Sequence, residues 1–118
     1  MAQKDELGRQ GEQMASDHRE ACGYRILDRN WQCSQGELDL VAEDDGTLVF
    51  VEVKTRSGVA FGDPSEAITA RKLARIGRLA GAWCAEHRPR SRRMRVDVVG
   101  IVVPPAGEIR LQHLRGVS

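Results

Sequence analysis

The chain of 118 residues contains 41% hydrophobic and 30% charged residues, a balance typical of a globular protein with one core. No run approaches the roughly 18 apolar residues of a membrane-spanning helix, and no apolar secretory signal is visible at the N-terminus. Three scattered cysteines, none at zinc-binding spacing, indicate reduced thiols. We therefore expect one domain over residues 1–118 that is cytoplasmic and does not contact a membrane.

The net charge of +1 conceals an uneven distribution along the chain. Residues 1–59 carry 7 Lys/Arg and 12 Asp/Glu, whereas residues 60–118 carry 11 and 5. Of the 18 basic residues, 15 are arginine, which suits bidentate contact with phosphate. An acidic half that binds cations and an arginine-rich half that binds a polyanion would account for this pattern. Ordinary solvated charge is the alternative.

The first predicted element is a helix over residues 4–22. Small and apolar residues recur there at three- and four-residue steps, and Gly23 is suited to end the helix. Its expected inward residues are Leu7, Gly11, Met14, Ala15, His18 and Cys22.

Three strands follow with short turns between them. Residues 24–33 form the first, with an irregularity near Asn30, and residues 37–43 and 47–56 form the next two. Asp45-Gly46 predicts a two-residue hairpin turn, because both central residues of such a turn need positive φ.

A second helix is predicted from Asp63, which would cap it together with Glu66, to about His87. Its expected inward residues are Ile68, Ile76, Leu79, Ala80, Trp83 and Cys84. An arginine-rich connector then leads to a buried strand over residues 96–103, and a weaker strand covers residues 108–114.

The order α-β-β-β-α-β-(β) predicts an α+β domain built on a single mixed sheet. The three strands with short connections would form an antiparallel meander. The second helix would be a right-handed crossover that returns residues 96–103 to the same sheet.

The predicted hairpin brings charged residues together. With Asp45-Gly46 as the turn, Asp39 lies opposite Glu52 and Glu37 lies opposite Lys54. Because side chains alternate along a strand, all four would project from one face. The other face would be filled by Leu38, Leu40, Val49, Val51 and Val53.

Facing carboxylates on a hairpin repel each other, and burial increases the cost. A divalent cation would offset this repulsion, and two or three carboxylate oxygens suit Mg²⁺. Lys54 would reach the same place, where an ammonium group can orient a water or neutralise charge on a phosphate. The alternative is solubilising charge on an outer face.

These residues also resemble a known signature. Asp39 followed by Glu52-Val53-Lys54 is similar to the D…(D/E)-x-K signature of the restriction-endonuclease-like (PD-(D/E)XK) nuclease superfamily, whose core has the same α-β-β-β-α-β order. The blocks GRQGEQMA, RILDRNW, GELDLV, LVFVEVKTR, FGDPSEAI with RKLARI, and RVDVVGI resemble the YraN-like family of small bacterial proteins. That family is similar to archaeal Holliday-junction resolvases. Leu38 stands where the superfamily often has a proline.

The resemblance implies a metal-dependent endonuclease that hydrolyses phosphodiester bonds in DNA, with branched or structured DNA as the expected substrate. It implies that Asp39, Glu52 and Glu12 bind Mg²⁺ or Mn²⁺, and that Lys54 is catalytic with them. Glu37 would lie around the metal ligands or pair with Lys54. A homodimer is a further expectation from the resemblance.

Basic residues are the candidates for nucleic-acid contact, with DNA favoured over RNA. They are Arg56, Arg71, Lys72, Arg75, Arg78, Arg92 and Arg93. Phosphate contacts of this kind give affinity and salt dependence without sequence readout. A non-catalytic nucleic-acid-binding module on the same fold is the first alternative function, and an interaction protein without a nucleic-acid role is the second.

Other polar and aromatic residues are expected to be structural. The serines and histidines show no triad-like arrangement. Trp31 is expected in the core or on an edge strand, with base stacking as the alternative. Asp97 is expected to pair with Arg95 or with a backbone amide.

Overall fold

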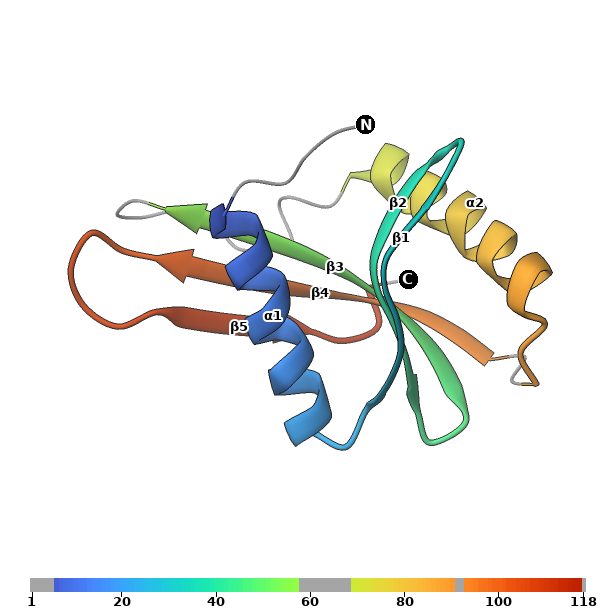
Figure 1. Cartoon of the computed structure of the whole chain (residues 1–118), viewed down its shortest axis with the longest axis horizontal. Helices are drawn as coiled ribbons and strands as arrows, with labels where there is room; N and C mark the ends of the chain where they lie inside the picture. The colour runs from blue at the N-terminus through green and yellow to red at the C-terminus, as the bar shows by residue number, and fades with distance from the viewer. Residues whose placement is uncertain (1–5, 58–68, 91–92, 118) are drawn as a thin grey trace.

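The computed structural model of the chain describes residues 6–57, 69–90 and 93–117. In these ranges two helices accompany one mixed five-stranded sheet, which confirms the predicted α+β class (Figure 1). The elements are α1 (Glu6–Ala21), β1 (Arg25–Cys33), β2 (Gly36–Asp44), β3 (Thr47–Ser57), α2 (Ala70–His87), β4 (Arg93–Val103) and β5 (Arg110–Leu114). Neither of these helices is long and apolar enough to cross a membrane.

The sheet has the strand order β1-β2-β3-β4-β5. Pairing is antiparallel from β1 to β3, parallel between β3 and β4, and antiparallel again between β4 and β5. The predicted meander and the return of the fourth strand to the same sheet are therefore confirmed. Parallel neighbours cannot be joined by a tight turn, and α2 lies in the long connection that joins them.

The hairpin between β2 and β3 has the predicted turn and register. Asp45 and Gly46 have φ values of 49° and 82°, as a turn with two left-handed residues requires. The strands pair from Asp44–Thr47 to Leu40–Val51. The turn chemistry therefore set the register of the whole paired segment.

Beyond Leu40–Val51 the two strands separate. β2 remains paired with β1 as far as Gly36–Cys33, while its pairing with β3 has ended. Figure 1 shows the β1–β2 hairpin turning away from β3. We call this separation, between residues 36–39 and 52–55, the strand fork. The predicted pairs Asp39–Glu52 and Glu37–Lys54 lie in the fork, beyond the last paired residues.

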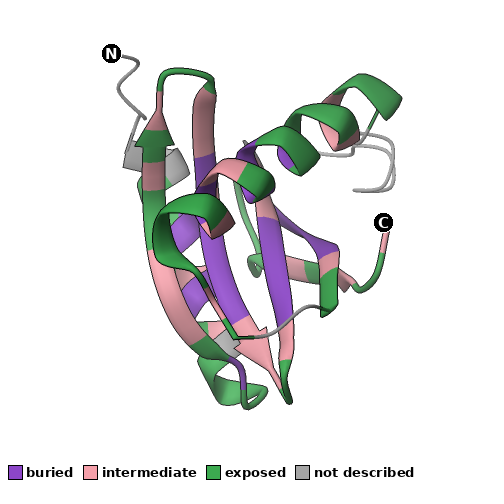
Figure 2. Cartoon of the chain, turned by 90° about the vertical axis from the view of Figure 1, so that its right-hand side faces the viewer, coloured by how far each residue is buried: buried purple, intermediate pink, exposed green. Residues whose placement is uncertain are grey.

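The core lies on both faces of the sheet, and its central strands are buried in Figure 2. On one face, Phe50 of β3 packs with residues of α2; we call this the α2-side core. On the other, Val51 of β3 packs with Ala15 of α1, which we call the α1-side core. The predicted inward residues of α2 that are buried are Ile76, Leu79, Ala80 and Trp83.

The prediction that Leu38 and Leu40 share a face was wrong. Leu38 packs in the α2-side core and Leu40 in the α1-side core. The cause lies on the neighbouring strand, where Asn30 has a φ of 50° and interrupts the two-residue alternation of β1. Arg29 and Trp31, on either side of it, pair with Leu40 and Leu38. The expected irregularity near Asn30 is confirmed. The paired segment of β2 also departs from two-residue alternation, between Leu38 and Leu40.

The buried face of α1 consists mainly of small residues. Gly11, Glu12, Ala15 and Ser16 are buried, whereas Cys22 is exposed, so its predicted inward place was wrong. Cys22 lies beyond the end of the helix. Small side chains allow α1 to lie close to the sheet, so the side chain of Glu12 on the same face of the helix is buried as well.

The second helix begins later than predicted. Thr69 has an extended backbone, and its Oγ1 accepts a hydrogen bond from the N–H of Lys72, 3.1 Å away. Thr69 is therefore the N-cap, and an uninterrupted helix from Asp63 was a wrong prediction. The predicted cap of Asp63 and Glu66, and the inward place of Ile68, lie outside the described residues.

Asp97 is fully buried on β4. It pairs with Arg95 and accepts from a backbone amide, as predicted. Arg95 Nε and the N–H of Gly116 donate to Oδ1 from 3.0 and 2.9 Å. His113 Nε2 and Tyr24 Oη lie 2.7 and 3.2 Å from Oδ2. Burial opposes ionisation of Asp97, but the hydrogen bonds from Arg95, Gly116 and His113 outweigh it and lower the pKa of Asp97.

Candidate metal centre

Three carboxylates meet at the strand fork. Each of Glu12, Glu37 and Asp39 offers one carboxylate oxygen, and these three atoms all lie within 4.8 Å of one another. Glu12 comes from α1, and the other two come from β2. We call these three residues the carboxylate cluster. The cluster brings together residues that are far apart in the sequence, because α1 packs against the sheet beside the strand fork.

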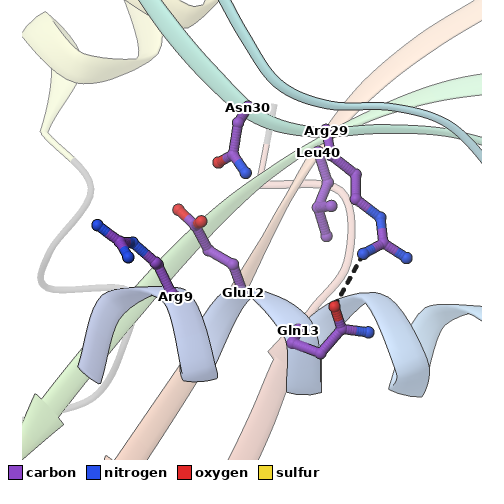
Figure 3. A pocket seen from close by; sticks show the side chains of 6 residues that line it. All are labelled: Arg9, Glu12, Gln13, Arg29, Asn30 and Leu40. Carbon is purple, nitrogen blue, oxygen red and sulfur yellow. Dashed lines mark hydrogen bonds between the residues drawn. The ribbon is translucent and has the colours of Figure 1, made fainter. Parts of the chain in front are cut away.

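Glu12 reaches the cluster from the buried side of α1, where it is 8% exposed. Figure 3 shows its carboxylate directed across a pocket toward Asn30 of β1. The pocket has a volume of about 180 Å³ and is lined by Arg9, Glu12, Gln13, Arg29, Asn30 and Leu40. Arg29 donates a hydrogen bond of 2.9 Å to Gln13 at its rim. The pocket therefore brings open space next to one carboxylate of the cluster.

Asp39 holds the strand fork in place. Its Oδ2 accepts a hydrogen bond of 2.8 Å from the backbone N–H of Val53. This N–H belongs to β3 beyond its last pair with β2, so the side chain supplies the acceptor that a neighbouring strand would otherwise supply. The carboxylate is thereby fixed between the two strands.

Glu52 interacts through charge with one member of the cluster, Asp39. Its neighbours Val51 and Val53 belong to the α1-side core, so alternation directs Glu52 toward α2. Burial, followed by the negative charge of Asp39, raises the pKa of Glu52 to about 7. Of the described acidic residues, the group within 4.8 Å includes Glu37 and leaves out Glu52, although the resemblance places Glu37 only around the ligands.

Three basic residues oppose this rise in the pKa of Glu52. They are Lys72 and Arg75 from α2 and Lys54 from β3. Cationic groups from two elements therefore act on Glu52. The sequence predicted Lys54 and Lys72 near the scissile phosphate, and in the structure both lower the pKa of Glu52.

The remaining basic candidates fall into two groups. Arg71 and Arg78 are exposed on α2, and Arg93 is exposed at the start of β4. The side chain of Arg56 and the whole of Arg92 lie outside the described part of the chain. Trp31 is half-buried on the edge strand β1, where its Nε1 donates to Glu86 at 2.8 Å, as expected for a structural residue.

The donor set of the cluster fits a hard divalent cation. All three side chains offer carboxylate oxygens, which Mg²⁺ and Mn²⁺ prefer, and neither sulfur nor imidazole belongs to the group. Three carboxylates this close repel one another in a partly buried place, and a cation between them would offset that cost. The arrangement could therefore hold a hard divalent cation.

Comparison with known proteins identifies a family. The model of "Uncharacterised protein family UPF0102" matches residues 11–101. A UPF0102 protein of Beutenbergia cavernae is 55% identical over 118 residues and is covered completely, as is this chain. A UPF0102 protein of Frankia alni is 56% identical over 116 residues, which cover 98% of this chain and 97% of the relative. One of Arthrobacter sp. strain FB24 is 53% identical over 118 residues.

Among solved structures, the chain is similar to the crystal structure of a repair endonuclease from Pyrococcus abyssi. The TM-score is 0.43 at 19% sequence identity. The similarity covers 89% of this chain and 41% of that one, so this chain spans less than half of that protein.

Proposed function

The chain belongs to the uncharacterised protein family UPF0102, and we propose that it is a metal-dependent endonuclease that hydrolyses phosphodiester bonds in DNA. The observation that carries this proposal is the carboxylate cluster at the strand fork, with its oxygens within 4.8 Å of one another. Lys54, Lys72 and Arg75 act on the adjacent Glu52. A cation site beside groups that bind phosphate is the combination that this chemistry needs.

Each part of the site has a distinct role in the proposal. Glu12, Glu37 and Asp39 hold Mg²⁺ or Mn²⁺, and Glu52 contributes its charge from the other side of Asp39. When bound, the cation supplies Lewis-acid stabilisation of the charge that develops on the phosphate. Lys54 neutralises part of the same charge. Because the cation ligands lie on β2 and on α1, and Lys54 lies on β3, these side chains would be in place before the substrate binds.

The exposed face of α2 provides the DNA contact in this proposal. Arg71, Arg75 and Arg78 are exposed on this helix at four- and three-residue spacing, so they form one row along it. Arginines in a row suit backbone phosphates and carry no base readout. The enzyme would therefore select its substrate by shape, which favours branched or distorted DNA.

A panel of duplex, single-stranded, flap and four-way DNA tests the proposal, with the matching RNA strands as a further arm. We expect cleavage of at least one DNA substrate with Mg²⁺ or Mn²⁺ and none with EDTA. Asp39→Asn, Glu52→Gln and Lys54→Ala should each reduce the rate by at least about 100-fold. Glu43→Gln is the matched control, because Glu43 lies on β2 but pairs with Arg25 at the surface, 3.0 Å away.

The outcomes separate the remaining functions. Salt-dependent DNA binding without cleavage in the presence of either metal would refute the nuclease proposal and support a non-catalytic DNA-binding module. Cleavage that persists in Asp39→Asn and Glu52→Gln would identify a contaminant. Absence of binding to DNA and RNA alike would refute a nucleic-acid role altogether.

A further inference from the structure

Helix α1 approaches β3 most closely at Gly11. A Cβ atom added to Gly11 would lie 1.8 Å from Oγ1 of Thr55, 3.0 Å from its Cβ and 3.1 Å from its Cγ2. Rotation about χ1 of Thr55 cannot relieve the Cβ contact, because that atom is fixed to the strand. The backbone of α1 therefore lies directly against the side chain of Thr55.

The two glycines of α2 behave differently. At Gly77 and Gly81 of α2 an added Cβ would meet nothing within 4 Å. A glycine inside a helix is less favourable than an alanine, so a glycine at position 11 opposes helix formation. The close approach to Thr55 is the physical reason for glycine at this position.

This contact lies next to a member of the carboxylate cluster on α1 and within the strand fork on β3. Gly11 precedes Glu12, and Thr55 follows Lys54. Glu12 is the member of the cluster that comes from α1, so the distance from α1 to the sheet decides whether its carboxylate reaches Glu37 and Asp39. A helix held further out would withdraw this carboxylate while leaving the other two in place.

We infer that Gly11 and Thr55 are positioning residues that set the distance between α1 and β3 and thereby place Glu12 in the carboxylate cluster. This inference rests on the proposed function, in which the cluster holds a cation. An alanine at Gly11 would have to move α1 outward by on the order of 1 Å to reach an ordinary contact distance. Displacements of this size are large compared with the tolerance of a preorganised site.

Gly11→Ala tests the inference, and Gly77→Ala is its matched control because it makes the same change in a helix with free space. Mn²⁺ binding is measured by titration calorimetry, and folding is measured by circular dichroism and thermal unfolding. We expect Gly11→Ala to weaken Mn²⁺ binding by roughly tenfold or more. Gly77→Ala should bind Mn²⁺ as the wild type does.

A second change should rescue the first. Thr55→Ala removes Oγ1 and Cγ2, so the double variant Gly11→Ala/Thr55→Ala should recover most of the lost Mn²⁺ affinity. A remaining deficit is expected from the Cβ of residue 55, which still lies 3.0 Å from the added atom. If Gly11→Ala does not fold, a folded double variant carries the test in its place.

The results distinguish this inference from the proposed function. A wild-type chain that binds no Mn²⁺ would overturn the proposed function and the positioning role with it. Wild-type binding that Gly11→Ala leaves unchanged would overturn the inference alone. A folded double variant whose Mn²⁺ affinity stays as low as that of Gly11→Ala, or falls lower, would also overturn it.

Discussion

The side chain of Asp39 accepts a hydrogen bond from the backbone N–H of Val53, with 2.8 Å between Oδ2 and the nitrogen. Asp39 lies on β2 and Val53 on β3, at the point where these strands no longer pair. One carboxylate therefore has two tasks. It satisfies a backbone donor that the fork would leave open, and it presents its charge to Glu12 and Glu37.

The two tasks of Asp39 can be separated by substitution. Asp39→Asn keeps an oxygen that accepts from Val53, so we expect stability close to that of the wild type and loss of Mn²⁺ binding. Asp39→Ala leaves the N–H of Val53 without its acceptor and should cost a further 1–3 kcal/mol or so. Urea unfolding compares the two variants, and equal stability would show that the hydrogen bond does not hold the fork.

The raised pKa of Glu52 predicts a pH-dependent gain in stability for Glu52→Gln. Burial and the charge of Asp39 raise this pKa from 4.5 to about 7. Ionisation of Glu52 is therefore less favourable in the folded chain, and the free energy of unfolding falls as pH rises from 4.5 to about 7. Glu52→Gln lacks this loss. With EDTA present, it should be more stable than the wild type at pH 8, by on the order of 2 kcal/mol, and nearly equal at pH 4. Glu43→Gln should show no such trend, and a parallel trend in both variants would contradict the assignment to Glu52.

Asp97 stabilises the fold in the opposite pH range. Burial opposes ionisation of Asp97, but hydrogen bonds from Arg95, Gly116 and His113 lower its pKa in the folded state. Its contribution to the free energy of unfolding is therefore fully present above the pKa of the unfolded chain, and it is lost as pH falls through the pKa of the folded chain. Asp97→Asn should destabilise the chain by about 3 kcal/mol at pH 7, because Arg95 loses a buried partner. The difference from the wild type should shrink in acid. Asp45→Asn is the control, because Asp45 is exposed in the turn between β2 and β3, and it should leave the free energy of unfolding nearly unchanged. Equal destabilisation by both changes would refute a special role of Asp97.

The arginine row on α2 predicts the salt dependence of DNA binding. Replacement of Arg71, Arg75 and Arg78 by glutamine should reduce the slope of log K against log salt by roughly 0.9 for each phosphate contact removed. Affinity for different sequences should fall uniformly. Arg110→Gln is the control, because Arg110 is exposed on β5 and belongs to neither α2 nor the fork. Fluorescence anisotropy at several salt concentrations measures both slopes, and an unchanged slope in the triple variant would remove α2 from the DNA interface.

The antiparallel meander and its central hairpin could be predicted because their signals are local. Asp45-Gly46 specifies a turn with two positive φ values, and that turn fixes the register as far as Leu40–Val51. Likewise, the β-branched run that includes Val98 and Val99 is buried, as such a run predicts for a central strand.

The strand fork could not be predicted, because it depends on contacts between distant residues. The positive φ of Asn30 on β1 turns Leu38 to the α2 side, and alternation within β2 alone gives the opposite face. The membership of Glu37 in the cluster follows from the position of α1 as well as from the fork. The GE-x-D spacing placed Glu37 near Asp39, but the place of Glu12 depends on how closely Gly11 lets the helix approach.

Anomalous diffraction from crystals of the chain grown with Mn²⁺ tests the central claim most directly, because it locates the cation without reference to activity. The account predicts one strong peak at the strand fork, within bonding distance of carboxylate oxygens from Asp39 and from at least one of Glu12, Glu37 and Glu52. Crystals of Asp39→Asn should lose this peak. A wild-type map without a peak at the fork, or with a peak that Asp39→Asn leaves unchanged, would contradict the claim that these carboxylates form a metal centre.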